Sequence, residues 1–357
     1  MSDNSRADAM NKPRVTIVVS PRERFGVAKE SLDSIYAKSD RPFELVYVDA
    51  RSPKRITEWL KVEAPAKGFK HIHLDRFVTP NEARNLGLAA ATTEFVIFID
   101  NDVVCADGWL SAMVRCADET EADVISPLVC EGLPLHSRIH QATGTFTKDR
   151  AAFYSAPKGE RELIDIMTHH GTPIERVRDQ LHREETELFE FHCVMVRRSI
   201  FDRVGCFDES MYATKEHVDF CMSVLKAGGK MMFEPTSVVT YVFPTSKNPV
   251  TREDSSFFLL RWSPKWQIHC LEHLREKWGL KDAEEYYAVR QPAYMRVRQF
   301  EGFIKPLLRS LPIIGRSYRL TQAARKLVTS YVDRKVERLA AEYEKQRAAQ
   351  KPATSSK

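Results

Sequence analysis

Short apolar segments rich in β-branched residues alternate with helical segments over the first 130 residues of the chain. The segments with strand character are 14–20, 43–49, 70–74, 94–99 and 123–127. The segments between them, 27–38, 56–62, 79–89 and 109–116, are predicted to be helices. Strands that alternate with helices indicate βαβ units, so we expect an α/β fold with a mostly parallel, Rossmann-like sheet flanked by helices.

Two carboxylates follow the most apolar of these strands. Asp100-Asn101-Asp102 comes directly after Glu94-Phe95-Val96-Ile97-Phe98-Ile99. Aspartates one residue apart in an extended segment point to the same side, and ligands of open α/β sheets bind at the carboxyl ends of the strands. Carboxylate oxygens suit Mg²⁺ or Mn²⁺, and such a cation can hold a diphosphate. The tripeptide therefore predicts a divalent metal site, with a simple Asx turn as the alternative.

The composition limits how phosphate could be bound. Only 14 of the 357 residues are glycine, and neither G-x-G-x-x-G nor G-x-x-x-x-G-K-[ST] occurs. A glycine-rich backbone cradle is thereby excluded, so metal and side chains would have to neutralise the phosphates. The net charge of +5 suits an anionic ligand or membrane surface, and we expect no nucleic-acid partner.

Targeting features and cysteines point to an intracellular protein. The first 12 residues are polar, and no apolar run approaches the roughly 20 residues that cross a bilayer. The seven cysteines are an odd number without a C-x-x-C pair, as expected for reduced thiols. We expect a cytoplasmic protein that can still lie against the inner face of the membrane.

The rest of the chain divides by pattern. Residues 1–12 and 351–357 are predicted to be disordered, and 131–190 lacks periodicity, as binding-loop insertions do. Strands are expected at 189–196, 230–235 and 237–242, and helices at 199–204 and 218–227. Residues 246–350 are expected to be helical, ending in one long amphipathic helix over 316–346. Its apolar stripe has two interpretations, packing against protein or contact with an anionic membrane through its basic face. The stripe comprises Leu320, Ala324, Leu327, Tyr331, Val336, Leu339 and Tyr343.

The order of the motifs resembles a known family. Asn-x-Ala-Arg-Asn-x-Gly at 81–87 precedes the Asp-x-Asp tripeptide, and Gly-x-Phe-Asp-Glu follows at 205–209. Together with Pro21 and Asp49 at the ends of two strands, this order resembles the family 2 glycosyltransferases of the GT-A fold between Val15 and Tyr241. The resemblance implies a GT-A domain at 13–245, an acceptor-binding insertion at 131–190 and a helical C-terminal extension at 246–350.

The resemblance also implies an activity. Family members of this kind transfer a sugar, with inversion, from a UDP-, GDP- or dTDP-linked donor to a glycan or lipid-linked acceptor, assisted by Mg²⁺ or Mn²⁺. Trp262 and Trp266 would join the insertion in binding the acceptor. The donor-site residues carried over are Pro21 and Glu23 in the nucleoside pocket, Asp49 as acceptor from the base, Arg84 near the diphosphate with Asn85 in support, Asp100 at the ribose or metal, and Asp102 as metal ligand.

The candidate base is less well defined. The family usually has a Glu-Asp pair before its late helix, where this chain reads Glu216-His217, and the family's histidine after the last strand is absent. Glu216, His217 and Asp219 are the catalytic candidates, although Asp219 also suits a helix N-terminus. His192 is a candidate for the acceptor site, and the neighbouring Cys193 is expected in the core.

Two rival functions remain open at this point. A sugar nucleotidyltransferase would use a similar sheet, but it would need a glycine-rich loop where this chain has Ser20-Pro21-Arg22-Glu23-Arg24. A catalytically inactive relative acting as a binding or scaffold protein would tolerate the histidine at position 217. His169-His170 is expected to lie in a loop, because no third metal ligand is evident beside it.

Overall fold

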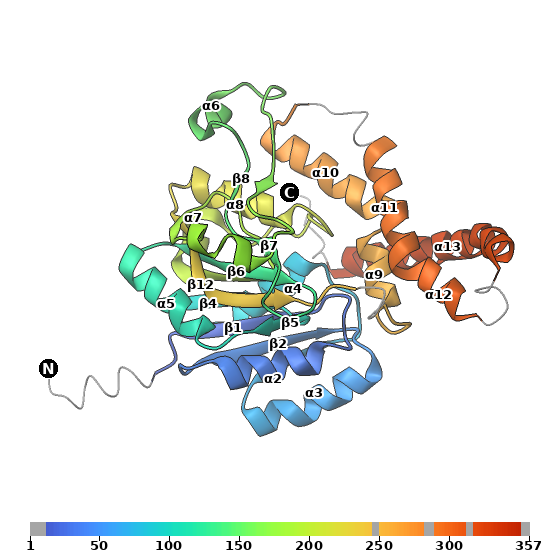
Figure 1. Ribbon diagram of the computed structural model, residues 1–357, viewed down its shortest axis with the longest axis horizontal. Helices are drawn as coiled ribbons and strands as arrows, with labels where there is room; N and C mark the ends of the chain where they lie inside the picture. The colour runs from blue at the N-terminus through green and yellow to red at the C-terminus, as the bar shows by residue number, and fades with distance from the viewer. Residues whose placement is uncertain (1–11, 245–249, 282–288, 312–316, 351–357) are drawn as a thin grey trace, which may run out of the picture.

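The computed structural model describes residues 12–244, 250–281, 289–311 and 317–350. A large mixed sheet with helices on both faces forms its centre, and further helices from the C-terminal part of the chain lie to one side (Figure 1). Except for Lys12, the terminal segments predicted to be disordered, 1–12 and 351–357, lie outside the described residues.

The main sheet has the strand order β10-β12-β6-β11-β4-β1-β2-β3, with β5 paired to β12 and β7 paired to β6. Strands β3, β2, β1 and β4 run parallel, and β11 enters antiparallel between β4 and β6. A separate small sheet pairs β8 with β9. The strand bounds are β1 (Val15–Ser20), β2 (Glu44–Ala50), β3 (Lys70–Leu74), β4 (Phe95–Asp100), β5 (Val103–Cys105), β6 (Val124–Glu131), β7 (Ile139–Gln141), β8 (Gly144–Thr145), β9 (Ile166–Met167), β10 (Glu184–Glu185), β11 (Cys193–Arg197) and β12 (Met231–Tyr241).

Helices cover both faces of the sheet. The strands β1 and β4 are buried on both faces, so the apolar side chains that point to either face need this cover. Apolar side chains of α2, α3 and α5 pack on one face, and those of α4, α8 and α10 pack on the other. The α-helix bounds are α2 (Ala28–Lys38), α3 (Lys54–Lys67), α4 (Pro80–Ala90), α5 (Trp109–Thr120), α6 (Arg150–Ser155), α7 (Phe201–Val204), α8 (Glu216–Lys226), α9 (Ser255–Arg261), α10 (Pro264–Trp278), α11 (Gln291–Gln299), α12 (Lys305–Ser310) and α13 (Tyr318–Gln350). Between α11 and α12 the helix takes a π-turn over Phe300–Ile304.

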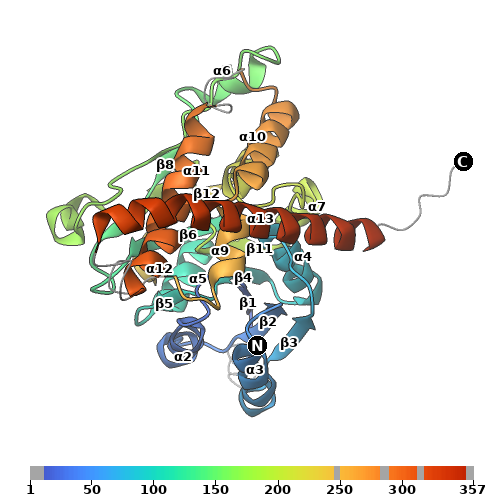
Figure 2. The same ribbon diagram turned by 90° about the vertical axis from the view of Figure 1, so that its right-hand side faces the viewer.

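The C-terminal helices share the core of the sheet domain. Trp266 and Leu274 of α10 and Tyr343 of α13 belong to the same buried cluster as the strand residues Val18 and Phe98. In Figure 2, α13 runs across the molecule over α9. The stripe predicted for α13 is split, because Val336 and Tyr343 are buried while Leu327 and Tyr331 are exposed. No helix within the described residues is both long and apolar enough to span a bilayer.

Several predicted boundaries are wrong. The strand expected at 189–196 begins only at Cys193, and the last two predicted strands are one strand, β12, with a bulge between Glu234 and Val238. Pro235 lies at that irregularity, where the loss of an N–H donor is tolerated. Glu216 and His217, expected just before a helix, are the first residues of α8. The insertion at 131–190 holds only short elements, in line with its weak periodicity.

Candidate active site

The carboxyl ends of the parallel strands bring the predicted site residues to one edge of the sheet. Asp100 ends β4 and pairs in register with Ser20 of β1, and Asp49 lies near the end of β2 on the other side of β1. Two strand spacings separate β2 from β4, so Asp49 and Asp100 lie about 10 Å apart. The site is therefore built on rigid, fully buried strands.

Asp100 is the centre of a buried ion-pair network. Its Oδ2 lies 3.1 Å from Arg22 Nε and 3.1 Å from His192 Nδ1. Its Oδ1 lies 3.7 Å from an Arg84 nitrogen. Burial alone would raise the pKa of the Asp100 carboxyl, but the cation of Arg22 and the hydrogen bond from His192 lower it. Asp100 is consequently held as a carboxylate.

Glu216 is held by the same two arginines. Its Oε1 lies 3.6 Å from Arg22 and 3.9 Å from Arg84. Burial opposes ionisation, yet both guanidinium groups lower the pKa of Glu216. Arg84 itself is fully buried, donates to Asn81 Oδ1 at 3.0 Å and lies 3.9 Å from the ring centre of Phe191. Arg84 and Glu216 thus join Asp100 in one network, while the place of Arg84 near a diphosphate stays a prediction.

Asp102 differs sharply from its neighbour. It is fully buried, and neither of its carboxylate oxygens has a hydrogen-bond partner among the described residues. Burial raises the pKa of Asp102 well above its usual value, and the carboxylates of Asp100 and Glu23 raise it further. Two adjacent carboxyl groups whose pKa values are driven apart, one of them unpartnered, form an arrangement suited to a cation. Asp102, with Asp100 beside it, fits a hard divalent metal, which prefers carboxylate oxygens.

Asp49 sits between two histidines of β3. Its Oδ2 lies 3.1 Å from His71 Nε2 and 2.8 Å from His73 Nδ1. Burial by itself would raise the pKa of Asp49, but hydrogen bonds, first among them those from His71, bring it to about 2. A carboxylate at this edge could accept a hydrogen bond from the N–H of a base.

The loop after β1 is closed over the site. Glu23 is buried and accepts a hydrogen bond from Arg261 of α9 at 2.6 Å. The backbone N–H of Arg22 donates to Asn101 Oδ1 at 2.8 Å. Pro21 and Glu23 border a cavity of only about 30 Å³. The space beside Pro21 is therefore too small for a nucleoside unless this loop or α9 moves, whereas Glu23 also borders a second cavity of about 840 Å³.

Two predicted site residues have other partners. Asn85 donates to the carbonyl of Phe207 and to Glu209, and it accepts from the Phe207 N–H, so it fixes the loop of the Gly-x-Phe-Asp-Glu motif. Asp219 accepts from Lys277 Nζ at 2.8 Å and from Trp278 Nε1 at 2.7 Å. Asp219 thereby ties α8 to α10, which favours its interpretation as a structural residue of the helix N-terminus.

His217 faces a carboxylate that the sequence did not single out. Its Nδ1 lies 3.7 Å from Glu190 Oε2, and its Nε2 is buried without a hydrogen-bond partner in the described chain. Burial alone would raise the pKa of Glu190, but His217 and the neighbouring His140 and His192 lower it to about 2. Glu190 escaped notice because it ends the aperiodic insertion.

Arg22 and Arg261 complete the set of site residues that the structure adds, and His192, a candidate for the acceptor site from the sequence, lies beside Asp100. Neither arginine belongs to a motif on which the family resemblance rests, so the sequence offered no reason to select them. His192 had been assigned to a strand; it precedes β11 and its ring stacks on Tyr241 with 3.9 Å between centres. Cys193 is buried in the core, as predicted.

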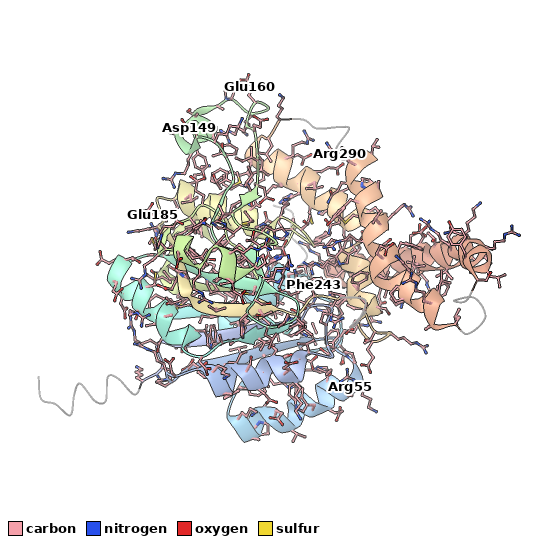
Figure 3. All side chains as sticks on the ribbon, viewed as in Figure 1. Arg55, Asp149, Glu160, Glu185, Phe243 and Arg290 are labelled. Atoms are coloured by element: carbon pink, nitrogen blue, oxygen red, sulfur yellow. The ribbon has the colours of Figure 1, made fainter. Side chains whose placement is uncertain are left out.

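A large cavity opens beside this network. It has a volume of about 840 Å³ and lies between the sheet domain and the C-terminal helices. Glu23, His140 and Tyr241 border it on the sheet side, and Trp262 and Arg298 border it on the helix side. Phe243, which also borders it, lies between the sheet and the C-terminal helices in Figure 3. Trp266, expected with Trp262, is instead buried against Tyr343 at 5.0 Å between ring centres.

Comparison with known proteins identifies the matching part of the chain. A family model described as glycosyl transferase family 2 matches residues 16–205. The pre-mycofactocin glycosyltransferase of Mycobacterium tuberculosis is 24% identical over 229 residues, covering 64% of this chain and 42% of the relative. Polypeptide N-acetylgalactosaminyltransferase 3 of Mus musculus is 25% identical over 260 residues, covering 70% of this chain and 39% of the relative. The chain thus spans less than half of the length of these curated relatives.

A solved structure agrees with the architecture. The crystal structure of GalNAc-T7 with UDP, GalNAc and Mn²⁺ superposes with a TM-score of 0.50 at 16% identity, covering 81% of this chain and 58% of that one. At this identity the likeness concerns the fold.

Proposed function

Because the chain belongs to glycosyl transferase family 2 and has the GT-A fold predicted from its sequence, we propose that it is a metal-assisted, inverting glycosyltransferase. Its donor would be a nucleotide-diphosphate sugar, and its acceptor a glycan or a lipid-linked glycan. The GT-A domain at 13–245 would bind the donor, and the extension at 246–350 would complete the acceptor side.

One observation carries this proposal. Asp102 is a buried carboxyl group at the carboxyl end of the sheet, and both of its oxygens lack partners within the described residues. A buried group of this kind costs stability and calls for a functional explanation. Together with Asp100 it would hold Mg²⁺ or Mn²⁺, which when bound neutralises negative charge on the departing diphosphate. The Mn²⁺ and UDP in the GalNAc-T7 structure support this assignment.

The donor would bind along the sheet edge. Asp49, ionised between His71 and His73, would accept a hydrogen bond from the base, and Pro21 and Glu23 would line the nucleoside pocket. Arg84 would lie near the diphosphate. Binding beside Pro21 would require the loop after β1 or α9 to move, since the pocket there is too small for a nucleoside.

His217 is the better candidate for the base that deprotonates the acceptor hydroxyl. Its Nε2 is buried and unpartnered in the described chain, and Glu190 stands behind its Nδ1 at 3.7 Å. A base must be free to take a proton, whereas Glu216 is held ionised between two arginines and has a lowered pKa. We therefore assign Glu216 to holding Arg22 and Arg84 in place, and Asp219 to packing.

The acceptor would occupy the 840 Å³ cavity. Aromatic side chains there, among them Tyr241 and Trp262, offer stacking surfaces for sugar rings. The exposed part of α13, which carries Leu327 and Tyr331 beside Arg325 and Lys326, would contact an anionic membrane surface and bring a lipid-linked acceptor near. Sedimentation with anionic vesicles, compared with neutral ones, tests this contact.

A screen of UDP-, GDP- and dTDP-sugars tests the proposed activity. Each is added with Mn²⁺, with Mg²⁺ and with EDTA, and thermal stability and donor turnover are followed. We expect one donor to raise the melting temperature only with metal, since a ligand that binds only the folded state stabilises it. Absence of any shift would contradict the proposal. Binding without turnover would instead favour the inactive binding protein, which the histidine at position 217 makes the second candidate.

A further inference from the structure

Three side chains able to bind a metal border the large cavity on its sheet side. Glu131 ends β6, His140 lies in β7, and His170 lies in the turn after β9. One carboxylate oxygen of Glu131 and one ring nitrogen of each histidine all lie within 4.8 Å of one another. These three residues are named here the Glu131 cluster. The sequence offers His170 no further ligand nearby, but the fold brings two to it.

Backbone hydrogen bonds hold the segments of the Glu131 cluster side by side. β6 and β7 pair antiparallel, and the N–H of Glu131 donates to the carbonyl of Arg138 at 2.8 Å. The turn that carries His170 is bonded to β7 as well, because the N–H of Gly171 donates to the carbonyl of Ile139 at 2.8 Å. The three side chains therefore project from neighbouring, hydrogen-bonded segments.

The ring nitrogens of the two histidines are already oriented. His170 Nδ1 donates to the carbonyl of His140 at 2.7 Å, so it carries the proton, and the lone pair of Nε2 is left for a cation. Histidines that bind metals usually donate their second ring N–H to a carbonyl or carboxylate in this way. His140 Nδ1 lies 3.0 Å from Glu131 Oε2. Two ligands about 2.1 Å from one ion lie about 3–3.4 Å apart, so both atoms can contact one ion with little movement.

The charges around the Glu131 cluster favour a cation. Burial alone would raise the pKa of Glu131, but the hydrogen bond from His140 and neighbouring positive charge lower it. A second carboxylate lies close, because one oxygen of Glu190 is within 4.8 Å of a ring nitrogen of His140. His140 is thus placed beside two carboxylates, which would stabilise a metal ion bound there.

We propose that the Glu131 cluster binds a divalent cation that prefers nitrogen ligands, Zn²⁺ first among them. Two imidazoles and one carboxylate are typical ligands of zinc, whereas the carboxylate oxygens of Asp100 and Asp102 suit Mg²⁺ or Mn²⁺. Three protein ligands leave a coordination position open, and all three border the cavity. A carboxylate, phosphate or hydroxyl oxygen of a molecule in the cavity can therefore complete the site. The inference does not depend on glycosyl transfer.

Two other groups within the described residues also bring three ligand atoms within 4.8 Å of one another. They are Asp49, His71 and His73, and His140, Glu190 and His192. In the first group both rings bond to the same oxygen of Asp49. In the second, His192 Nδ1 bonds to Asp100 at 3.1 Å, and neither His192 nor Glu190 is among the residues that border the cavity. The Glu131 cluster is therefore the group that opens to the cavity.

Calorimetric titration of the full chain with Zn²⁺ tests the inference, after metal has been removed with EDTA and without nucleotide. We expect the wild-type protein to bind Zn²⁺ at the cluster, and a large excess of Mg²⁺ not to displace it. His170→Gln and Glu131→Gln should each weaken this binding at least about 10-fold, because even the loss of a group behind a metal ligand costs about 10- to 100-fold. His170 is exposed, so the melting temperature of metal-free His170→Gln should equal that of the wild type.

His169→Gln is the matched control, because His169 lies in the same turn but outside the cluster. It should bind Zn²⁺ as the wild type does. Asp102→Asn and His71→Gln, which alter the donor site and the group of Asp49, should also keep this binding. No Zn²⁺ binding to wild type, an equal loss in His169→Gln, or a loss confined to Asp102→Asn or His71→Gln would overturn the proposal.

Visible absorption of the protein loaded with Co²⁺ gives a second readout. Tetrahedral Co²⁺ absorbs far more strongly than the hydrated ion, so the wild type should show an intense band that His170→Gln lacks. A weak spectrum like that of hydrated Co²⁺ would show an ion held mainly by water and would overturn the proposal.

Donor binding is measured in parallel. UDP and GDP with Mn²⁺ should bind His170→Gln as they bind the wild type. If Zn²⁺ binding depends on the Glu131 cluster while no nucleotide binds any of the proteins, glycosyl transfer fails and the metal site stands. If nucleotides bind and the cluster has no effect on Zn²⁺, the metal site alone is refuted.

Discussion

Replacing Arg22 by methionine should destabilise the protein far more than the loss of a surface arginine. Arg22 lies 3.1 Å from Asp100 and 3.6 Å from Glu216, and its side chain is only 5% exposed. Methionine keeps much of the side-chain volume of arginine, but it removes the positive charge beside the buried carboxylates of Asp100 and Glu216. Removing one partner of a buried ion pair costs about 3–5 kcal/mol. At roughly 2 °C per kcal/mol for a large chain, the melting temperature should fall by about 6–10 °C.

Arg14→Met is the matched control. Arg14 lies 2.8 Å from both Glu94 and Asp118, closer than Arg22 lies to its partners, but its side chain is 39% exposed. Water screens such pairs, so the loss should be about 1 kcal/mol or less. Urea unfolding at pH 7 measures both variants. If Arg22→Met lowers the free energy of unfolding no more than Arg14→Met does, the argument that burial makes the ion pairs of Arg22 more important is refuted.

The acid side of the stability profile gives a second check on Arg22. The pKa of Asp100 is lowered in the folded protein, with Arg22 the leading favourable cause. Its unfolded value is about 3.9, so the stabilisation is fully present above that pH and is lost as the pH falls through the folded-state pKa. The difference in the free energy of unfolding between wild type and Arg22→Met should therefore become smaller below about pH 4. In the double variant with Asp100→Asn, the free energy of unfolding should fall by less than the sum of the losses in the two single variants.

Three further substitutions test other parts of the account. Asp49→Asn should cost about 2–3 kcal/mol at pH 7, because the pKa of Asp49 is about 2 in the folded protein, and urea unfolding should show that this difference disappears as the pH falls from 4 to 2. Asp219→Asn should lower stability by about 1–3 kcal/mol through its lost ion pair yet leave transfer by the folded protein intact; a severe loss of transfer would restore Asp219 as a catalyst. Gly87→Ala should destabilise by about 1–3 kcal/mol, because its Cβ would meet Val18 Cγ1 at 2.1 Å, and a higher melting temperature would show that Val18 moves aside freely.

The parallel half of the sheet could be predicted because its signal is local. β1, β2, β3 and β4 are short β-branched runs, and their bounds differ from prediction by at most one residue at either end. Once these strands are parallel, their carboxyl ends share an edge, and the placement of Asp49 and Asp100 follows. The helix predicted at 79–89 is α4, which begins at Pro80, directly after Thr79, whose side chain accepts from the Glu82 N–H.

The ion pairs and hydrogen bonds of the site could not be predicted, because their partners are far apart in the chain. The N–H of Arg22 donates to Asn101 across 79 residues, and Trp278 donates to Asp219 across 59. His192 meets Asp100 only because β11 inserts antiparallel beside β4, a choice that no local pattern encodes. The bulge in β12 misled the strand assignment, since Pro235 interrupts the alternation without ending the strand.

Binding of Mn²⁺ to the wild-type protein and to Asp102→Asn, in the presence of UDP or GDP, tests the central claim most directly. The electron paramagnetic resonance signal of free Mn²⁺ falls when the ion is bound, so the measurement does not depend on knowing the acceptor. We predict that the wild-type protein with its nucleotide removes Mn²⁺ from solution and that Asp102→Asn, although folded, does not. Equal Mn²⁺ binding by the two proteins would contradict the assignment of Asp102 as the metal ligand.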